Sequence, residues 1–112
     1  MNNTVILVTN NGMGKADEAL SLTLFGKYLE LLLQNKQLPA AICFYTDGVK
    51  LVCEGSPVLE QLRELEAINV RLIVCSTCLN YFGLQDKVRV GIVGGMSDIL
   101  EAQLRAEKVI TL

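Results

Sequence analysis

Short apolar runs alternate with segments of helical periodicity along the whole chain. Four of the runs occupy residues 4–9, 40–46, 70–75 and 87–93, and a last one occupies 109–112. Continuous apolar runs of this length, rich in β-branched residues and bounded by turn residues, are typical of strands that are buried on both faces. The pattern therefore predicts five strands.

A long first helix is predicted over residues 15–35. One strip of this segment carries apolar residues at helical spacing, with a second apolar strip beside it. The residues of the first strip are Leu20, Leu24, Tyr28 and Leu31. Two adjoining apolar strips make a wide nonpolar face, so we expect this helix to be well buried.

Three shorter helices are predicted between the later strands. Ser56 followed by Pro57 is typical of an N-cap and a first helical residue, and this helix should continue to about residue 67. A short helix is expected over 77–82 and should end at Gly83. Ser97 is expected to cap a fourth helix that ends near residue 106.

Strands that alternate with helices, joined by short connections, predict an α/β fold. Right-handed crossovers place helices on both faces of a mostly parallel sheet. We therefore expect a three-layer α/β/α sandwich with a five-stranded sheet. A chain of 112 residues is expected to form a single domain over residues 1–112.

Composition excludes several classes of function. The net charge is −2 and no cluster of Lys and Arg is present, so nucleic acid is not an expected partner. No apolar run approaches the roughly 18 residues of a membrane span, and the first residues lack the pattern of a signal peptide, so we expect a cytoplasmic protein. The absence of histidine excludes Ser–His–Asp and Cys–His catalysis and imidazole metal sites.

Four cysteines remain as the candidate chemical groups, and in the cytoplasm they should be reduced. Cys75 and Cys78 form a CxxC pair at the end of the third predicted strand, where ligands of open α/β sheets bind. A thiolate beside a helix N-terminus has a lowered pKa, so we expect Cys75 to be ionised at neutral pH. The hydroxyls of Ser76 and Thr77 should then help to stabilise the anion.

Two other interpretations of the cysteines remain open. Cys75 and Cys78 could be small hydrophobic residues that fill the corner between strand and helix, and an interior role is expected for Cys43 inside a strand. The role of Cys53 in a loop is left open. A structural zinc site needs four ligands, usually in two close pairs, and this pattern is missing, so we expect no metal and no other cofactor.

The loops that follow the first two predicted strands are candidates for the lining of a pocket. The segment NNGMGK at 10–15 departs from the Walker pattern at Ala16 and from the dinucleotide fingerprint at Asp17. A tight glycine turn is the favoured explanation of this segment, although its backbone amides could hold a small anion. The candidate lining residues are Asn11, Gly12, Gly14 and Lys15, together with Tyr45 and Gly48 from the second loop.

Three motifs give the chain a resemblance to a known family. The segments GMGKAD, GVKL followed by EGSPVLE, and CSTCLNYFGLQDK lie in one order between Val5 and Ile99. In these motifs the chain resembles the DsrE/DsrF-like sulfur-relay superfamily. The likeness is strongest to the DsrE-type domain of YedF-like selenium-metabolism proteins.

The resemblance implies a three-layer α/β/α fold, a homo-oligomer and transfer of sulfur as a cysteine persulfide. It assigns the carrier to the cysteine just past the third strand, which is Cys75 here, and it identifies Cys78 as the extra cysteine typical of YedF-like proteins. Those proteins usually carry a TusA-like domain that this sequence does not contain. The resemblance therefore implies a separate TusA-like or other protein as sulfur donor or acceptor.

Three functions follow from the sequence as hypotheses. The first is a sulfurtransferase-like carrier of sulfur or selenium, in which Cys75 takes the sulfur and Cys78 resolves the persulfide. The second is a dithiol redox protein or sensor that uses the same pair. The third is a non-enzymatic, oligomeric interaction module in which the cysteines are structural.

Overall fold

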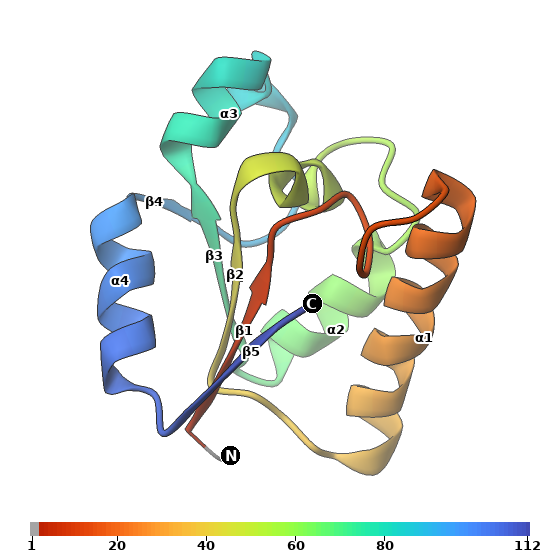
Figure 1. Ribbon diagram of the computed structural model, residues 1–112, viewed down its shortest axis with the longest axis vertical. Coiled ribbons are helices and arrows are strands. Elements are labelled where there is room, and N and C mark those ends of the chain that lie inside the picture. Colours follow the sequence, from red (N-terminus) through yellow and green to blue (C-terminus); the bar gives the residue numbers. More distant parts are fainter. Residues whose placement is uncertain (1–2) are drawn as a thin grey trace.

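A five-stranded parallel sheet forms the centre of the computed structural model, which describes residues 3–112 (Figure 1). The strand order is β4-β3-β2-β1-β5, and each neighbouring pair is parallel. This arrangement confirms the predicted fold class, because parallel neighbours require crossover connections that cover the sheet with helices. The strands are β1 (Thr4–Val8), β2 (Ala41–Phe44), β3 (Arg71–Cys75), β4 (Ile92–Gly94) and β5 (Lys108–Thr111).

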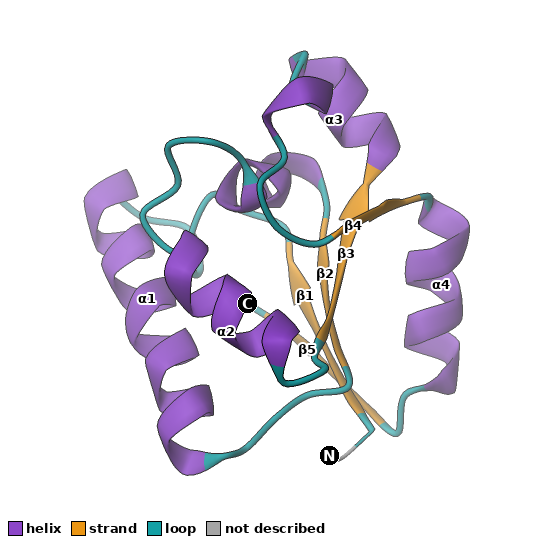
Figure 2. Ribbon diagram, turned by 180° about the vertical axis from the view of Figure 1, so that it is seen from behind, coloured by secondary structure: helices purple, strands orange, loops and turns teal. Residues whose placement is uncertain are grey.

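The helices form a layer on each side of the sheet. Helices α1 (Glu18–Asn35) and α2 (Leu59–Ala67) lie on one face, and α4 (Met96–Arg105) lies on the opposite face (Figures 1 and 2). Helix α3 (Ser76–Phe82) stands above the carboxyl end of β3, outside both layers. The end of the sheet that carries α3 is therefore where the candidate chemistry gathers.

The core is built from the central strands, as their apolar runs predict. All four residues of β2 and the last four of β1 and of β3 are buried. Phe25 and Leu29 of α1 and Leu62 and Leu65 of α2 are fully buried against the same face. Burial of one such side chain contributes roughly 1.5–3 kcal/mol to folding, which explains why apolar runs of only four or five residues suffice to define these strands.

Helix α1 is less buried than its apolar content predicts. The residues of α1 that are buried are Ser21, Phe25 and Leu29, which recur every four positions. Leu20, Leu24 and Leu31 are exposed. The prediction of a well-buried helix was wrong because α1 has only a sheet and α2 to pack against, so its outer strip has no partner within residues 3–112.

Three predicted helix starts move by two or three residues. Helix α1 begins at Glu18 rather than at residue 15, because the glycine loop continues to Asp17. Helix α2 begins at Leu59, after a turn in which Ser56 Oγ accepts a hydrogen bond from the Val58 N–H at 3.3 Å. Helix α4 is capped at Gly95 instead of Ser97, and its Gly95 N–H donates to the Asp98 carboxylate at 2.8 Å.

The strand expected over 87–93 is the least accurate prediction. Only its last residues form β4, because Gly91 has a φ of +89° that interrupts an extended chain. The preceding residues pair elsewhere: Val88 forms an isolated bridge with Cys53, and the Arg89 N–H donates to the Val52 carbonyl at 2.9 Å. Residues 87–91 therefore fasten a loop to the core.

A 3₁₀ helix, η1 (Thr46–Val52), replaces the loop expected after the second strand. Its residues Gly48, Val49, Leu51 and Val52 are buried. The Gly48 position has no room for a side chain, since a Cβ there would overlap the Val8 carbonyl oxygen. This close approach fastens η1 to the carboxyl end of β1, next to α3.

Candidate functional site

The CxxC pair lies where β3 turns directly into α3. Cys75 is the last residue of β3 and the N-cap of α3, and Cys78 lies in the first turn of the helix. Gly83 ends α3 with a φ of +68°, a left-handed conformation that favours glycine, which confirms the predicted helix end. The three-residue spacing within one helical turn brings the two side chains together, and all four cysteines of the chain are free thiols.

The two thiols differ in their access to solvent. Cys75 is only 2% exposed and belongs to the core cluster. Cys78 is half-buried at the surface of the same corner. A donor or reagent that approaches the described chain therefore meets Cys78 first.

Thr46 supplies a hydrogen bond to the more accessible thiol. Its backbone N–H donates to Cys78 Sγ at 3.1 Å. Thr46 has a φ of +50°, which is uncommon for a β-branched residue, and its hydroxyl donates to the carbonyls of Thr9 at 2.6 Å and Tyr45 at 2.7 Å. These bonds hold the residue in a strained conformation with its N–H directed at the sulfur.

The environment of Cys78 favours the protonated thiol. Burial raises the pKa of the Cys78 thiol above its ordinary value, and a hydrogen bond with the Cys75 side chain raises it further, while the Thr46 N–H lowers it. The hydroxyls of Ser76 and Thr77 make no hydrogen bond to either sulfur within residues 3–112. The described chain thus holds Cys78 as a thiol that needs an incoming base or partner to become nucleophilic.

The other two cysteines are packed in the interior. Cys43 lies inside β2, as expected, and burial raises its pKa to about 11 despite the opposing effect of the Arg71 charge. Cys53, whose role the sequence left open, is also buried, and its thiol donates to the Val49 carbonyl at 3.2 Å. Burial raises the pKa of Cys53, and the Arg89 charge opposes this shift. Both residues behave as small hydrophobic groups.

A polar cleft of about 320 Å³ lies between the β1–α1 loop and η1. Three of the residues that the sequence singled out, Asn11, Gly14 and Lys15, line this cleft. Glu18 and Ser21 of α1 and Lys50 of η1 also line the cleft, and the sequence pattern does not single them out because they come from helices rather than from the glycine loop. Asn10 and Ala16 of the loop and Asp47 of η1 complete the lining.

The remaining candidate residues lie outside the cleft lining. Gly12 is buried beneath it with a φ of +134°, and a Cβ at this position would lie 2.6 Å from the Ser21 Cβ. Gly48 lies against β1, and Tyr45 packs partly against the core. Gly12 and Gly48 are therefore needed because neighbouring segments pack too closely against their backbone for a side chain to fit, rather than because they contact a ligand. The spacing of residues in the sequence does not reveal this distinction.

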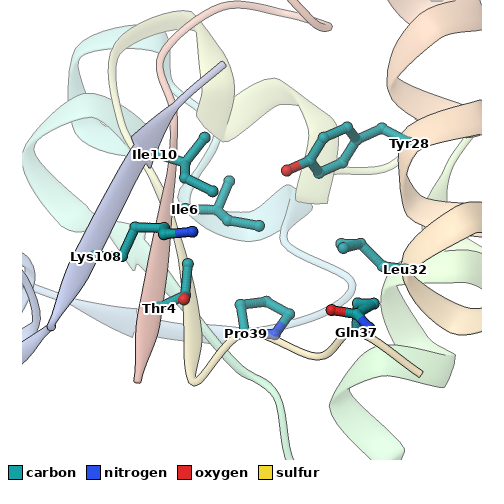
Figure 3. A pocket seen from close by; sticks show the side chains of 8 residues that line it. All are labelled: Thr4, Ile6, Tyr28, Leu32, Gln37, Pro39, Lys108 and Ile110. Carbon is teal, nitrogen blue, oxygen red and sulfur yellow. The ribbon is translucent and has the colours of Figure 1, made fainter. Parts of the chain in front are cut away.

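A second pocket, of about 150 Å³, lies at the opposite end of the strands, between α1 and β5 (Figure 3). Tyr28 of α1 and Lys108 of β5 face each other across it, with Ile6 and Ile110 between them. Burial raises the pKa of Tyr28. No cysteine lines this pocket, so it is separate from the CxxC pair.

No group of three or more Cys, Asp or Glu side chains that could hold a metal ion occurs within residues 3–112. None of the described helices is long and apolar enough to cross a membrane.

Comparisons with known proteins agree with this architecture. A family model described as the DsrE/DsrF-like family matches residues 3–112. The crystal structure of the YchN protein from E. coli is similar with a TM-score of 0.71 and 24% identity, over 100% of both chains. MTH1491 from Methanobacterium thermoautotrophicum, described as a protein of unknown function, has a TM-score of 0.70 and 21% identity over 97% of each chain. No curated protein sequence matches the chain.

Proposed function

The chain belongs to the DsrE/DsrF-like family, which is associated with sulfur relay, and from this membership we propose that it carries sulfur as a persulfide on its CxxC pair. The observation that carries the proposal is that Cys75 and Cys78 lie near each other at the carboxyl end of β3, one at the N-cap and the other in the first turn of α3. The relay is proposed to run in the cytoplasm, where thiols stay reduced. The likeness to YedF-like proteins and a role in selenium metabolism remain narrower predictions within the family.

The different burial of the two thiols supports an order for the transfer. The resemblance assigned the carrier to Cys75, whereas its burial favours Cys78 as the residue that meets the donor. The Cys78 sulfur, after loss of its proton, attacks the outer sulfur of a donor persulfide R–S–SH. A Cys78–S–SH persulfide forms, the donor S–S bond breaks, and the donor leaves as R–SH with the proton.

The second thiol of the pair provides a way to release the sulfur. An acceptor thiol can take the outer sulfur of the Cys78 persulfide directly. Alternatively, the Cys75 sulfur attacks the inner sulfur, which forms a Cys75–Cys78 disulfide and releases hydrogen sulfide. The disulfide then requires two electrons and two protons from a cellular dithiol before the next cycle. The donor or acceptor is proposed to be a TusA-like or other sulfur-carrying protein.

Mass spectrometry of the intact protein after incubation with a persulfide donor tests this proposal. We expect wild type to gain one sulfur atom, Cys78→Ala to gain none, and Cys75→Ala to retain its adduct for longer because the resolving thiol is absent. An adduct on Cys78→Ala but not on Cys75→Ala would instead make Cys75 the carrier. An adduct that is undiminished in the double variant would refute a persulfide on this pair, since Cys43 and Cys53 are then the acceptors.

A dithiol redox function is the second candidate, and the same pair of neighbouring thiols favours it. The pair is reduced in the structure and its spacing within one turn is compatible with a disulfide. Reversible oxidation with a potential in the range of thiol oxidoreductases, without sulfur transfer, would support this alternative.

Homo-oligomer formation is part of the proposal. Helix α4 carries an exposed apolar strip, on which Met96, Leu100 and Leu104 recur every four residues. Ile92 and Val93 of the neighbouring edge strand are exposed as well. Contiguous exposed apolar surface is typical of contact surfaces between proteins, so we propose that a second copy of the chain covers this face.

A further inference from the structure

The cleft between the β1–α1 loop and η1 carries balanced charges. Two ammonium groups, those of Lys15 and Lys50, line it together with two carboxylates, those of Glu18 and Asp47. Lys50 Nζ lies 2.8 Å from an Asp47 oxygen, so this pair is already neutralised. An inorganic dianion therefore meets no net positive charge here, whereas a small zwitterion finds a partner for each of its ends.

Ser21 provides an independent sign that a polar ligand fits this cleft. Ser21 is 4% exposed and lines the cleft, and within residues 3–112 its hydroxyl has no hydrogen-bond partner. Buried hydroxyl groups are almost always paired, because an unpaired one loses its hydration without compensation. A ligand carboxylate at the floor of the cleft would accept the hydrogen bond of this hydroxyl.

Helix η1 is shared by the cleft and the cysteine pair. Asp47 lines the cleft, and the preceding residue, Thr46, donates its N–H to Cys78 Sγ. Lys50 lines the cleft as well, and its ammonium lies 4.5 Å from the centroid of the Phe82 ring at the end of α3. The cleft therefore adjoins the cysteine pair along η1, which contributes residues to both.

We propose that the cleft binds the amino-acid part of a small thiol or persulfide. Lys15 and the Ser21 hydroxyl hold the ligand carboxylate, and Glu18 holds its ammonium group. The identity of the ligand as a sulfur compound rests on the proposed function, while the binding of the zwitterion does not. In the transfer step R–S–SH and the Cys78 thiol become R–SH and Cys78–S–SH, with R the bound amino acid.

Binding is measured on the Cys75→Ala/Cys78→Ala variant, which prevents transfer. Cysteine, alanine, acetate and inorganic phosphate are titrated separately, and the amide resonances of the chain are followed by NMR. We expect cysteine and alanine to shift the resonances of Gly14 and Lys15, and acetate and phosphate to bind at least tenfold more weakly. Lys15→Ala is expected to weaken binding of cysteine by about tenfold, because it removes a charge-assisted hydrogen bond.

Matched variants keep this experiment decisive. Lys108→Ala removes an ammonium from the distant pocket and should leave the affinity for cysteine unchanged. Ser21→Ala should weaken the affinity for cysteine severalfold. If this variant does not fold, Lys15→Ala provides the test, because Lys15 is exposed. Phosphate that binds as well as cysteine, or cysteine that binds Lys15→Ala as well as the parent, would overturn the zwitterion site. A failure of binding here, with a persulfide adduct still formed on wild type, would refute the ligand class and leave the proposed function standing.

Discussion

The backbone N–H of Thr46 and the sulfur of Cys78 are 3.1 Å apart, although the two residues are separated by 32 positions in the chain. The contact depends on a positive φ at Thr46, which is unfavourable for a β-branched residue. The Thr46 hydroxyl holds this conformation through its bonds to the carbonyls of Thr9 and Tyr45. A strained residue that directs its N–H at the more accessible thiol of the pair supports the proposed role of this sulfur.

Thr46→Ala is predicted to make Cys78 less reactive. The variant loses both hydroxyl bonds, so the N–H is no longer fixed, and the group that lowers the pKa of Cys78 is weakened. The pKa should therefore rise, and alkylation of Cys78 by iodoacetamide at neutral pH should slow about two- to tenfold. The measurement is the rate of modification at Cys78, resolved from the other cysteines by peptide mass spectrometry.

Thr77→Ala is the matched control for that experiment. Thr77 is exposed beside Cys78, and within residues 3–112 its hydroxyl makes no hydrogen bond to a sulfur, so its removal should not change the rate. Equal slowing in the two variants, or no slowing in Thr46→Ala, would contradict the role assigned to the Thr46 N–H.

Gly48→Ala is predicted to be strongly destabilising. A Cβ at this position would overlap the carbonyl oxygen of Val8, so η1 must move away from β1. Backbone cannot yield as a flexible side chain does, and we expect a loss of about 2–4 kcal/mol in the free energy of unfolding. Urea denaturation measures this loss. A loss below about 0.5 kcal/mol, which is typical of surface substitutions, would show that η1 does not depend on the close contact between Gly48 and Val8.

Gly26→Ala is predicted to have the opposite effect. Gly26 lies in the middle of α1, and a Cβ there would meet Val58 Cγ1 at 3.8 Å, which is ordinary van der Waals contact. Alanine in a helix is favoured over glycine by roughly 0.5–1 kcal/mol, so urea denaturation should show a gain of about that size. A destabilised variant would mean that α1 and α2 approach more closely than this contact indicates.

Much of the fold could be predicted from the order of apolar runs. The runs that became β1, β2 and β3 are flanked by turn residues and are buried on both faces, so pattern and environment agree. The prediction and the structure differ where apolar residues belong to a loop. Val88 and Val90 belong to a run that resembles a strand, yet Gly91 interrupts it and Val88 pairs with Cys53 instead.

The orientation of α1 could not be derived from spacing, because apolar residues occur all around this helix. Leu20 and Leu24 are exposed while the polar Ser21 between them is buried. The reason is the close packing of Ser21 against Gly12 and the hydrogen bond from the Met13 N–H to the Ser21 carbonyl at 2.9 Å. These contacts involve a loop whose path the sequence pattern does not specify.

The candidate site was predictable in its thiols but not in their surroundings. A CxxC pair after an apolar run indicates a strand–helix corner, and Cys75 and Cys78 lie there. The burial of Cys75 depends on packing by several elements, and the Thr46 hydrogen bond depends on η1, which the sequence pattern presents as a loop. Contacts between segments far apart in the chain decide both properties.

The stability of the protein is predicted to fall between about pH 9 and pH 11. The pKa of Cys43 is raised by burial from an ordinary value of 9.0 to about 11 in the folded chain, so the unfolded chain loses this proton first. The protonated Cys43 thiol therefore contributes about 2–3 kcal/mol to the free energy of unfolding. This contribution is present in full below pH 9 and disappears as the pH rises through 11. Urea denaturation at pH 8, 9.5 and 10.5 measures it.

Cys43→Ala separates this effect from the titration of other groups in the same range. The variant is less stable overall because it leaves a small cavity in β2, but its stability should decline less steeply with pH than that of wild type. Parallel declines in the two proteins would show that Cys43 is not the titrating group.

Leu100→Glu is predicted to reduce the oligomeric state. Leu100 is 51% exposed in the middle of the strip that Met96 and Leu104 continue on α4, so a charge there would lie at the centre of the proposed contact surface. Burial of an unpaired carboxylate is costly, and the measured mass should fall toward that of the 12.3 kDa chain. Light scattering coupled to size-exclusion chromatography gives this mass.

Leu20→Glu is the matched control, because Leu20 is equally exposed at 51% but lies on α1, on the opposite side of the sheet. The two variants lose the same apolar side chain and gain the same charge, so only their position differs. If β4 and α4 form the contact between copies, the Leu100→Glu oligomer should dissociate and the Leu20→Glu oligomer should not. The reverse result would transfer the contact to the exposed strip of α1, and a wild-type protein with the mass of one chain would refute assembly through either face.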